Sequence, residues 1–201
     1  MSQDHKQEQI IEAAIKRFAH FGVGKTTMNE IAGDLSISKA LLYYYFPDKN
    51  SLYAAVLMHI FKITSEHTNQ LLEKEQDPLK MMHIFLERRT EYIIKYYNVI
   101  AFLKSFTHAN LPKNLEELFT HLRRKELNRI TSIIEKGRQQ KVFLIKDVEK
   151  TAELYHDFLE GYRTSFFAHN PSIFPEKEQF QAILEKEKAF SDIFFKGLSA
   201  E

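Results

Sequence analysis

The sequence of 201 residues has a formal net charge of +1, with 44% hydrophobic residues, 27% charged residues and no cysteine. These values are typical of a globular protein of one or two domains with a substantial core, and the near-neutral charge does not by itself indicate a nucleic-acid binder. The lack of cysteine excludes disulfides and thiol catalysis, and no apolar run reaches the roughly 18–20 residues that cross a bilayer, so we expect a cytoplasmic protein without a membrane partner.

The chain begins with a predicted amphipathic helix over about residues 7–21. Its apolar positions recur with the period of one helix face, at Ile11, Ile15 and Phe18. Gly22 follows, and a glycine after the last periodic residue is typical of a helix end. We therefore expect a turn between this helix and the next element.

The next element is a short helix that a capping box opens. Thr27 is a good N-cap, and Glu30 lies three residues further on, where its side chain can reach back to the cap. Ile31 and Leu35 then share one apolar face at i and i+4. The polar run 36–38 is expected to break this helix.

A second short helix follows the break, with Ser36 or Ser38 as its N-cap. Leu42 and Phe46 repeat at i and i+4 and are expected to point inward. The three tyrosines 43–45 span about 200° on a helix, so at least one of them must face inward. The outer side is expected to carry Lys39, Ala40, Tyr43 and Tyr44. A short packed helix followed by one with a polar outer face is the pattern of a DNA-reading helix-turn-helix.

These two helices resemble the DNA-binding motif of the TetR family of transcriptional regulators. The family's usual run is an Ile-Ala pair, a Val/Ile-Ser turn, Leu-Tyr-x-Tyr/His-Phe and then a Lys. The matching positions here are Ile31-Ala32, Ile37-Ser38, Leu42-Tyr43-Tyr44-Tyr45-Phe46 and Lys49. The resemblance is specific to about residue 60, because beyond it only size and helical character match.

The resemblance implies that the N-terminal head binds an operator in double-stranded DNA, most often as a repressor. Thr27 and Lys49 are expected to hold phosphates, Lys39 to contact guanine or a phosphate, and the two outer tyrosines to pack on the sugar-phosphate edge or a thymine methyl. The complete set of expected DNA contacts is Thr27, Ser38, Lys39, Ala40, Tyr43, Tyr44 and Lys49.

The rest of the chain is also predicted to be helical, with prolines at the boundaries, where they do not interrupt helices. Helices are expected over about residues 49–73, 79–97, 99–108, 115–140, 147–169 and 176–198, and the apolar run 142–145 is interpreted as a connection. The first of these helices is the expected arm between a head at 1–50 and a body at 51–201. The predicted fold class is all-α, with a three-helix head and a larger helical domain for effector binding and dimerisation.

Aromatic residues are dense in the middle helices. The resemblance implies a small-molecule pocket there, and the aromatic side chains favour an apolar effector; without the resemblance, a packed core is the simpler interpretation. The expected pocket residues are Phe85, Tyr92, Tyr96, Phe102, Phe106 and Phe119.

The last two predicted helices carry apolar residues at three- and four-residue steps. The resemblance implies that these helices form a four-helix bundle between two subunits, whereas the alternative is that they pack only on their own domain. Two heads about 34–36 Å apart, or a multiple of it, would read a pseudo-palindrome. The expected interface residues of the homodimer are Tyr155, Leu159, Tyr162, Phe166, Ile183, Phe190 and Phe194.

We expect no metal, no cofactor and no catalytic site. Glu153 and His156 have the Glu-x-x-His spacing of di-iron bundles, but such sites need a second copy and two further glutamates, so His156 is interpreted as a surface or interface residue. The main alternative is a helical enzyme or metal-binding bundle with an interaction head, which requires a convergent cluster of polar ligands inside the body. No such cluster is evident in the sequence. A third possibility is an activator or nucleoid-type factor without an effector.

Overall fold

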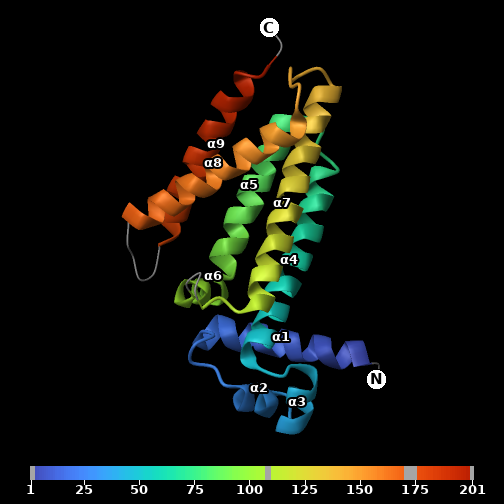
Figure 1. Cartoon of the computed structure of the whole chain (residues 1–201), viewed down its shortest axis with the longest axis vertical. Helices are drawn as coiled ribbons and strands as arrows, with labels where there is room; N and C mark the ends of the chain where they lie inside the picture. The colour runs from blue at the N-terminus through green and yellow to red at the C-terminus, as the bar shows by residue number, and fades with distance from the viewer. Residues whose placement is uncertain (1–2, 107–109, 170–175, 200–201) are drawn as a thin grey trace. The chain divides into compact units, whose positions relative to one another are not determined.

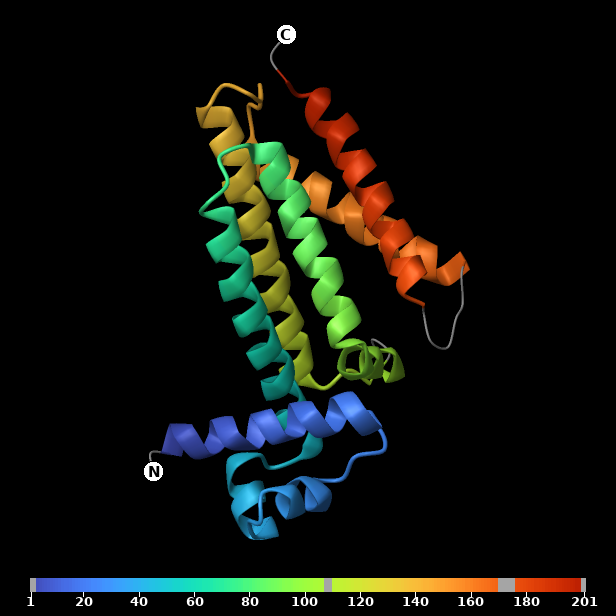
Figure 2. The same ribbon diagram turned by 180° about the vertical axis from the view of Figure 1, so that it is seen from behind.

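The computed structural model describes residues 3–106, 110–169 and 176–199, and these residues are helical throughout apart from short connections. The helices are α1 (Gln3–Phe21), α2 (Met28–Asp34), α3 (Lys39–Tyr45), α4 (Lys49–Leu72), α5 (Pro78–Lys95), α6 (Tyr97–Ile100), the 3-10 helix η1 (Ala101–Ser105), α7 (Lys113–Gln139), α8 (Val148–His169) and α9 (Lys177–Lys196) (Figures 1 and 2). The prediction of an all-α fold is therefore confirmed. The end of the expected helix 99–108 and the turn at Asn170, Pro171 and Pro175 lie outside the described residues.

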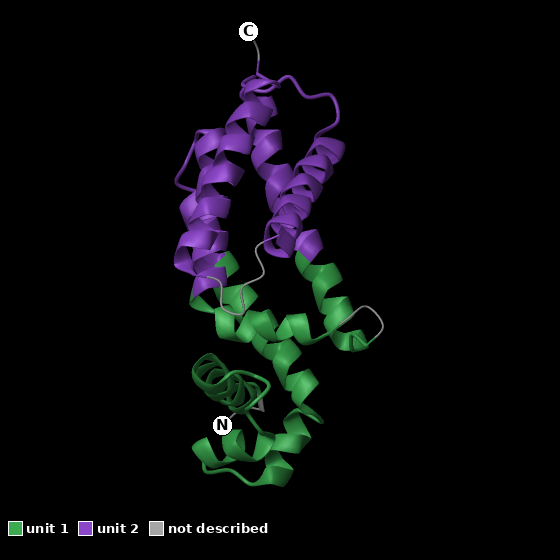
Figure 3. Ribbon diagram, turned by 90° about the vertical axis from the view of Figure 1, so that its left-hand side faces the viewer, with its two compact units in different colours: residues 1–65, 95–122 green, residues 66–94, 123–201 purple. Residues whose placement is uncertain are grey.

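The chain divides into two compact units, and each is built from segments that are separate in sequence (Figure 3). Unit 1 contains residues 1–65 and 95–122, and unit 2 contains residues 66–94 and 123–201. The functional division into a head at 1–50 and a body at 51–201 remains a prediction.

Unit 1 is organised around α1. Ile10, Ala14 and Phe18 are fully buried along one face of this helix. Gly22 ends it with a φ of 80°, a left-handed conformation that glycine adopts without steric cost, and its N–H donates to the carbonyl of Phe18 at 2.9 Å.

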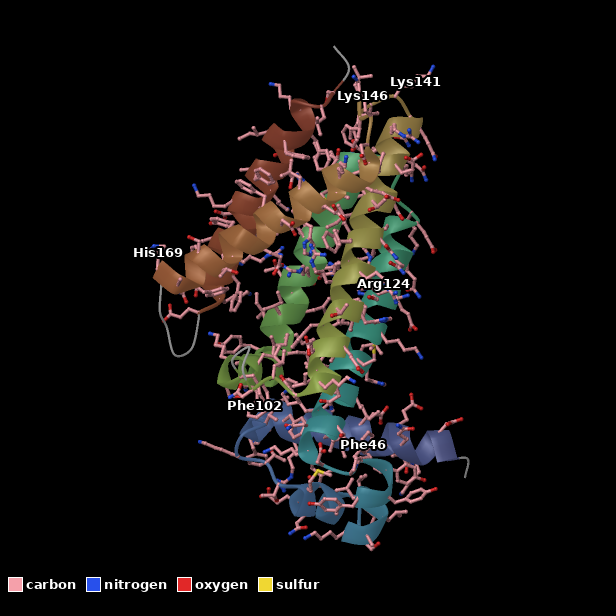
Figure 4. The ribbon with its side chains drawn as sticks, viewed as in Figure 1. Phe46, Phe102, Arg124, Lys141, Lys146 and His169 are labelled. Carbon is pink, nitrogen blue, oxygen red and sulfur yellow. The ribbon has the colours of Figure 1, made fainter. Side chains whose placement is uncertain are left out.

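The short α6 and η1 segment packs on the N-terminal helices of unit 1. The buried Tyr53 hydroxyl donates to the carbonyl of Val99 at 2.8 Å, and Asn98 Nδ2 donates to the carbonyl of Ala19 at 2.8 Å. The ring of Phe102, which is labelled in Figure 4, lies edge-on to the Tyr53 ring with centroids 5.2 Å apart. Residues 97–105 are therefore joined to α1 and α4 by hydrogen bonds as well as by apolar contact.

Unit 2 has an apolar core to which α5, α7, α8 and α9 all contribute. Its fully buried members include Met82, Leu86, Ile134 and Tyr155. The Tyr155 ring packs against Phe190, Phe194 and Phe195 of α9 at centroid distances of 5.2–5.7 Å. Aromatic packing thus fastens α8 to α9 within the chain.

The connection from α7 to α8 begins with a left-handed residue. Lys141 has a φ of 60°, and the N–H groups of Lys141 and Val142 donate to the carbonyls of Arg138 and Gly137, the pattern of a Schellman cap. The Phe143 side chain then folds back onto Gly137, and Phe143 makes an isolated antiparallel bridge to Ser199. The apolar run 142–145 is a connection, as predicted, and no strand occurs in the described residues.

A network of ionisable side chains lies inside unit 2. We call it the buried ion-pair network; its members are Arg89, Glu126, His156, Glu160, Arg163 and Glu187. Arg89 of α5 donates from Nε to Glu126 at 3.0 Å and from Nη2 to Glu160 at 2.6 Å. Burial raises the pKa of Glu126, but Arg89 and His156 together outweigh this effect and hold that pKa at about 2.

Two sequence interpretations are wrong at this network. His156 is not a surface residue, because it is 5% exposed and its Nε2 lies 3.7 Å from Glu126 Oε2. A convergent polar cluster does exist inside the body. The contacts between helices in it join residues too far apart in sequence for local spacing to reveal them, as with Arg89 and Glu160, which are 71 residues apart.

Within the described part of the chain, no helix is long and apolar enough to cross a membrane.

Candidate nucleic-acid interface

The first helix of the candidate motif, α2, starts at a complete capping box. The Glu30 N–H donates to Thr27 Oγ1 at 3.3 Å, while Glu30 Oε2 accepts from the Thr27 N–H at 2.7 Å and from its hydroxyl at 2.8 Å. These hydrogen bonds from Thr27 lower the pKa of Glu30, so the carboxylate stays ionised near neutral pH. Thr27 is exposed, but its hydroxyl is already engaged with Glu30.

The turn between α2 and α3 is a Schellman cap with a non-glycine residue. Ser36 has a φ of 50°, its N–H donates to the carbonyl of Gly33, and the N–H of Ile37 donates to the carbonyl of Ala32, both at 3.0 Å. Ser38 then caps α3 by accepting from the N–H of Leu41 at 3.1 Å. Of the two serines expected as the N-cap of α3, the structure uses Ser38. Ser36 is instead the left-handed residue that ends α2.

The candidate reading helix α3 separates its apolar and polar faces as the spacing predicted. Leu42 is fully buried, and Phe46, which follows α3, is 4% exposed (Figure 4). Ser38, Lys39 and Ala40 are exposed at the start of the helix. These three residues form the N-terminal end of the solvent-facing side of α3.

The three tyrosines of α3 have different environments. Tyr43 and Tyr44 are 39% and 69% exposed, whereas Tyr45 is half-buried. The Tyr44 and Tyr45 rings meet edge-on with centroids 5.3 Å apart, and Lys39 Nζ lies 5.6 Å from the Tyr43 ring centroid. The inward member of the run is thus Tyr45, and the two tyrosines expected to contact DNA are the exposed ones.

Lys49 is more constrained than the sequence suggested. Its Nζ donates to the carbonyl of Gly24 at 3.2 Å and lies 5.8 Å from the centroid of the Phe102 ring. Partial burial lowers the pKa of this amine, an effect that the Glu30 carboxylate opposes. Lys49 therefore fastens the turn after α1, and a phosphate contact by it stays a prediction.

Sequence reasoning missed Arg17, which lies against both acidic residues of α2. Its Nε donates to Asp34 Oδ2 at 2.8 Å, and its Nη1 lies 3.6 Å from Glu30 Oε1. Because these partners are 13 and 17 residues away, no helical spacing rule connects them. Arg17 supplies positive charge that offsets the acidic residues of the motif.

The expected effector residues fall in both units. Phe85 is buried in the core of unit 2 beneath Arg129, and Tyr92 pairs through its hydroxyl with His67 Nδ1 at 2.5 Å. In unit 1, Phe102 packs between Tyr53 and Phe106. Tyr96 is buried and Phe119 is half-buried, also in unit 1. A pocket that joins these residues remains a prediction.

The expected dimer residues are largely used within the chain. Tyr155, Leu159 and Ile183 are buried, and Tyr162, Phe166, Phe190 and Phe194 are half-buried. The exposed large apolar side chains of α8 and α9 are different ones: Leu154, Phe158 and Ile193, which are 62%, 54% and 73% exposed.

Comparison with known proteins identifies the head. Residues 10–56 match the model of "Bacterial regulatory proteins, tetR family". The N-terminal head thus matches the DNA-binding region of the TetR family. The match ends at the eighth residue of α4, so it covers the motif and the start of the helix that follows.

Relatives of the chain are named as regulators of transcription. It is 30% identical over 105 residues to the "Probable acrEF/envCD operon repressor" of Escherichia coli K12, covering 51% of this chain and 47% of that one. It is 25% identical over 199 residues to the regulator QacR of Staphylococcus aureus Mu50, covering 96% and 98% of the two chains. The matched region thus spans about half the length of the first of these relatives.

A solved TetR-like fold also matches over nearly the whole chain. The transcriptional regulator from Cytophaga hutchinsonii superposes with a TM-score of 0.85 at 29% identity, covering 97% of this chain and 99% of that one. A TetR transcription regulator from Haloarcula marismortui gives 0.75 at 18% identity, covering 98% and 100%, and that likeness concerns the fold alone.

Proposed function

We propose that the protein is a DNA-binding transcriptional regulator, and that it acts as a repressor. The observation that carries the proposal is α3, whose cap and outer face are exposed while Leu42 and Phe46 are buried. The match of the head to the TetR family supports this reading, and a relative named as an operon repressor supports the direction of regulation.

In the proposed complex, α3 lies in the major groove with its N-terminal residues nearest the base edges. Lys39 donates to guanine or to a phosphate, and Tyr43 and Tyr44 pack on the sugar-phosphate edge or a thymine methyl. Most of these contacts are to the sugar-phosphate backbone, and they fix the register of the protein on DNA without reading the sequence. One head is therefore expected to bind weakly. Specificity then requires a second head on a second half-site.

We assign the pairing of heads to a homodimer formed through α8 and α9. Leu154, Phe158 and Ile193 are the large apolar side chains that these helices leave exposed within the described residues. Exposed apolar residues grouped on two adjacent helices are typical of an interaction site. These three residues, rather than the buried Tyr155 and Leu159, would be the centre of the interface.

The proposed repressor leaves its operator when a small apolar effector binds among the middle helices. A change in the position of Phe102 would be transmitted to the head, because residues 97–105 are hydrogen-bonded to α1 and α4. An effector that engages Phe102 or Phe106 would therefore act on the arm and change the spacing of two paired heads. Only a ligand with different affinities for the two states can do this, and the difference needed for nearly complete release is about 5.5 kcal/mol.

Selection of bound DNA from a random pool, repeated with a panel of apolar and aromatic compounds, tests the proposal. The expected result is a pseudo-palindrome whose recovery falls with at least one compound. Enrichment of no sequence, or equal enrichment by a variant that lacks both exposed tyrosines (Tyr43→Ala with Tyr44→Ala), would contradict the DNA assignment. A palindrome insensitive to every compound would leave the DNA assignment intact and count against the effector.

A further inference from the structure

Three members of the buried ion-pair network converge as metal ligands do. Glu126 projects from α7, and His156 and Glu160 project from α8, where their i, i+4 spacing places them on one helix face. One possible ligand atom from each lies within 4.8 Å of the others. An ion bound at roughly 2.0–2.2 Å from each donor needs them about 3–4 Å apart, so a small contraction completes the set.

Arg89 does not occupy all of the donor atoms. It bonds Oε1 of Glu126 and Oε1 of Glu160. The second oxygen of Glu126 instead faces His156 Nε2 at 3.7 Å. The ring nitrogen thus faces the Glu126 oxygen that Arg89 does not bond.

A carboxylate outside the three ligands orients the histidine ring. His156 Nδ1 lies 3.3 Å from Asp157 Oδ1, and Asp157 Oδ1 in turn accepts from Arg123 Nη2 at 2.8 Å. A carboxylate on one ring nitrogen fixes the tautomer that leaves a lone pair on the other, which is the usual arrangement behind a metal-bound histidine. In a metal-bound form this arrangement would leave the lone pair on Nε2, the nitrogen that faces Glu126, for the ion.

The network contains more carboxyl groups than guanidinium groups. Three carboxyl groups, those of Glu126, Glu160 and Glu187, stand against the two guanidinium groups of Arg89 and Arg163. Glu187 is 1% exposed, and although its Oε1 lies against Arg163 Nε, that oxygen accepts no hydrogen bond from the described residues. Burial raises the pKa of Glu187 to about 8, so its carboxyl group is mostly protonated at neutral pH and adds little to the negative charge of the network.

We propose that Glu126, His156 and Glu160 bind a divalent transition-metal ion of the Zn²⁺ type. One imidazole nitrogen and carboxylate oxygens suit Zn²⁺, Co²⁺ or Ni²⁺, whereas Ca²⁺ and Mg²⁺ take oxygen ligands in larger number. Three protein ligands leave a coordination position for water or a further ligand. The ion joins α7 to α8 within unit 2, and its binding does not depend on the proposed DNA function.

Metal titration of the full chain tests this proposal. The chain is stripped with a chelator and dialysed, and ZnCl₂ is then added in a calorimeter, with Co²⁺ absorption spectra and X-ray absorption of the Zn²⁺-loaded chain alongside. The expected result is one Zn²⁺ per chain, a Co²⁺ spectrum with visible bands, and a first shell of oxygen and one imidazole. Asp157→Asn, at an exposed positioning residue, is expected to weaken Zn²⁺ binding about 10- to 100-fold, and His156→Gln or Glu160→Gln to weaken it by more.

Two residues on the same helix provide matched controls. Glu153 and His169 are exposed on α8, so Glu153→Gln and His169→Gln are expected to bind Zn²⁺ as the unaltered chain does. Circular dichroism reports whether each variant is folded; if His156→Gln does not fold, Glu160→Gln and Asp157→Asn decide the matter. Absence of stoichiometric Zn²⁺ binding, binding that survives all three site variants, or a first shell without imidazole would overturn the proposal and leave the network as ion pairing alone.

Discussion

Arg17 spans the two acidic residues of α2, and its position bears directly on how a nearly neutral head can approach DNA. Its guanidinium pairs with Asp34 and lies close to Glu30, whose carboxylate stands at the capped start of the helix. Without this cation, two negative charges would face the phosphates that α2 is proposed to approach. Ion pairing by Arg17 therefore reduces repulsion and leaves Lys39 as an exposed positive charge at the start of α3.

The proposed phosphate or base contact of Lys39 has a measurable signature. Each phosphate contact contributes close to one unit to the slope of log K against log salt, so Lys39→Ala in a two-headed complex is expected to reduce that slope by about 2. If the lysine holds a phosphate, binding weakens equally for all sequences; if it reads guanine, discrimination at one position of each half-site is lost. Lys146→Ala, an exposed lysine in the connection before α8, is the control and is expected to leave the slope unchanged (Figure 4). An unchanged slope together with unchanged sequence discrimination for Lys39→Ala would remove this residue from the interface.

The buried hydroxyl of Tyr53 joins α4 to the carbonyl of Val99. Tyr53→Phe keeps the ring contact with Phe102 but leaves that carbonyl without its donor, so we expect the free energy of unfolding to fall by about 1–3 kcal/mol. Urea denaturation measures this change. Tyr44→Phe, which alters an exposed hydroxyl, is expected to change stability by less than about 0.5 kcal/mol. Equal effects of the two variants would show that the Tyr53 hydroxyl bond does not stabilise unit 1.

At the scale of helices, local signals predicted where elements begin and end, but on α8 they could not predict what covers an apolar face. The caps at Thr27 and Ser38 and the glycine after α1 act over three or four residues, so spacing alone identifies them. On α8, however, Tyr155 and Leu159 were expected at a subunit interface and are buried in their own chain. Apolar periodicity shows that a face is covered, but what covers it depends on the packing of α9, which is remote in sequence.

The same dependence on remote contacts applies at Gly137 in α7. A Cβ there would lie 2.2 Å from Cδ2 of Phe143, whose ring stacks on Phe195 with centroids 4.9 Å apart. Helix propensity favours alanine over glycine by about 1 kcal/mol, but the clash with a packed ring is expected to cost about 1–3 kcal/mol or more. Gly137→Ala should therefore destabilise the chain in urea denaturation. Gly33→Ala is the matched control, since nothing lies within 4 Å of its added Cβ and the substitution is expected to be neutral or stabilising. A stabilising Gly137→Ala would mean that the connection after α7 is not packed as described.

The exposed apolar face of α8 and α9 gives a test of the proposed homodimer. Ile193 is 73% exposed, so a charge at this position disturbs its own chain little while it would be buried in a pairing of two chains. Ile193→Glu is expected to be folded and monomeric at micromolar concentration in sedimentation, whereas the unaltered chain is dimeric. Leu144→Glu, at an exposed leucine in the connection between α7 and α8, is expected to remain dimeric. A dimeric Ile193→Glu chain would place the interface elsewhere.

At the scale of the whole chain, sequence patterns predicted the all-α fold and the motif, and the buried ion-pair network could not be foreseen. The motif is contiguous, so its inward and outward residues follow from helical spacing, as Leu42 and Tyr44 illustrate. The network draws its six residues from four helices, and a lone Arg89 or Glu187 has the same local pattern as a solvated one. Only tertiary contact distinguishes a buried ion pair from a charged surface.

Pairing of two heads and reading of DNA are coupled in the proposed function, and the monomeric variant separates them. A single head makes half of the phosphate contacts, so Ile193→Glu is expected to bind the selected operator with about half the salt slope of the dimer, since the slope is proportional to the number of phosphates neutralised. Its affinity should no longer depend on the spacing between the half-sites, whereas the dimer should lose affinity when that spacing is changed by half a helical turn. Binding to a single half-site should be equal for the two proteins, because α3 is untouched by the substitution. A monomeric variant that keeps the full slope and the spacing dependence would show that the heads pair on DNA without α8 and α9.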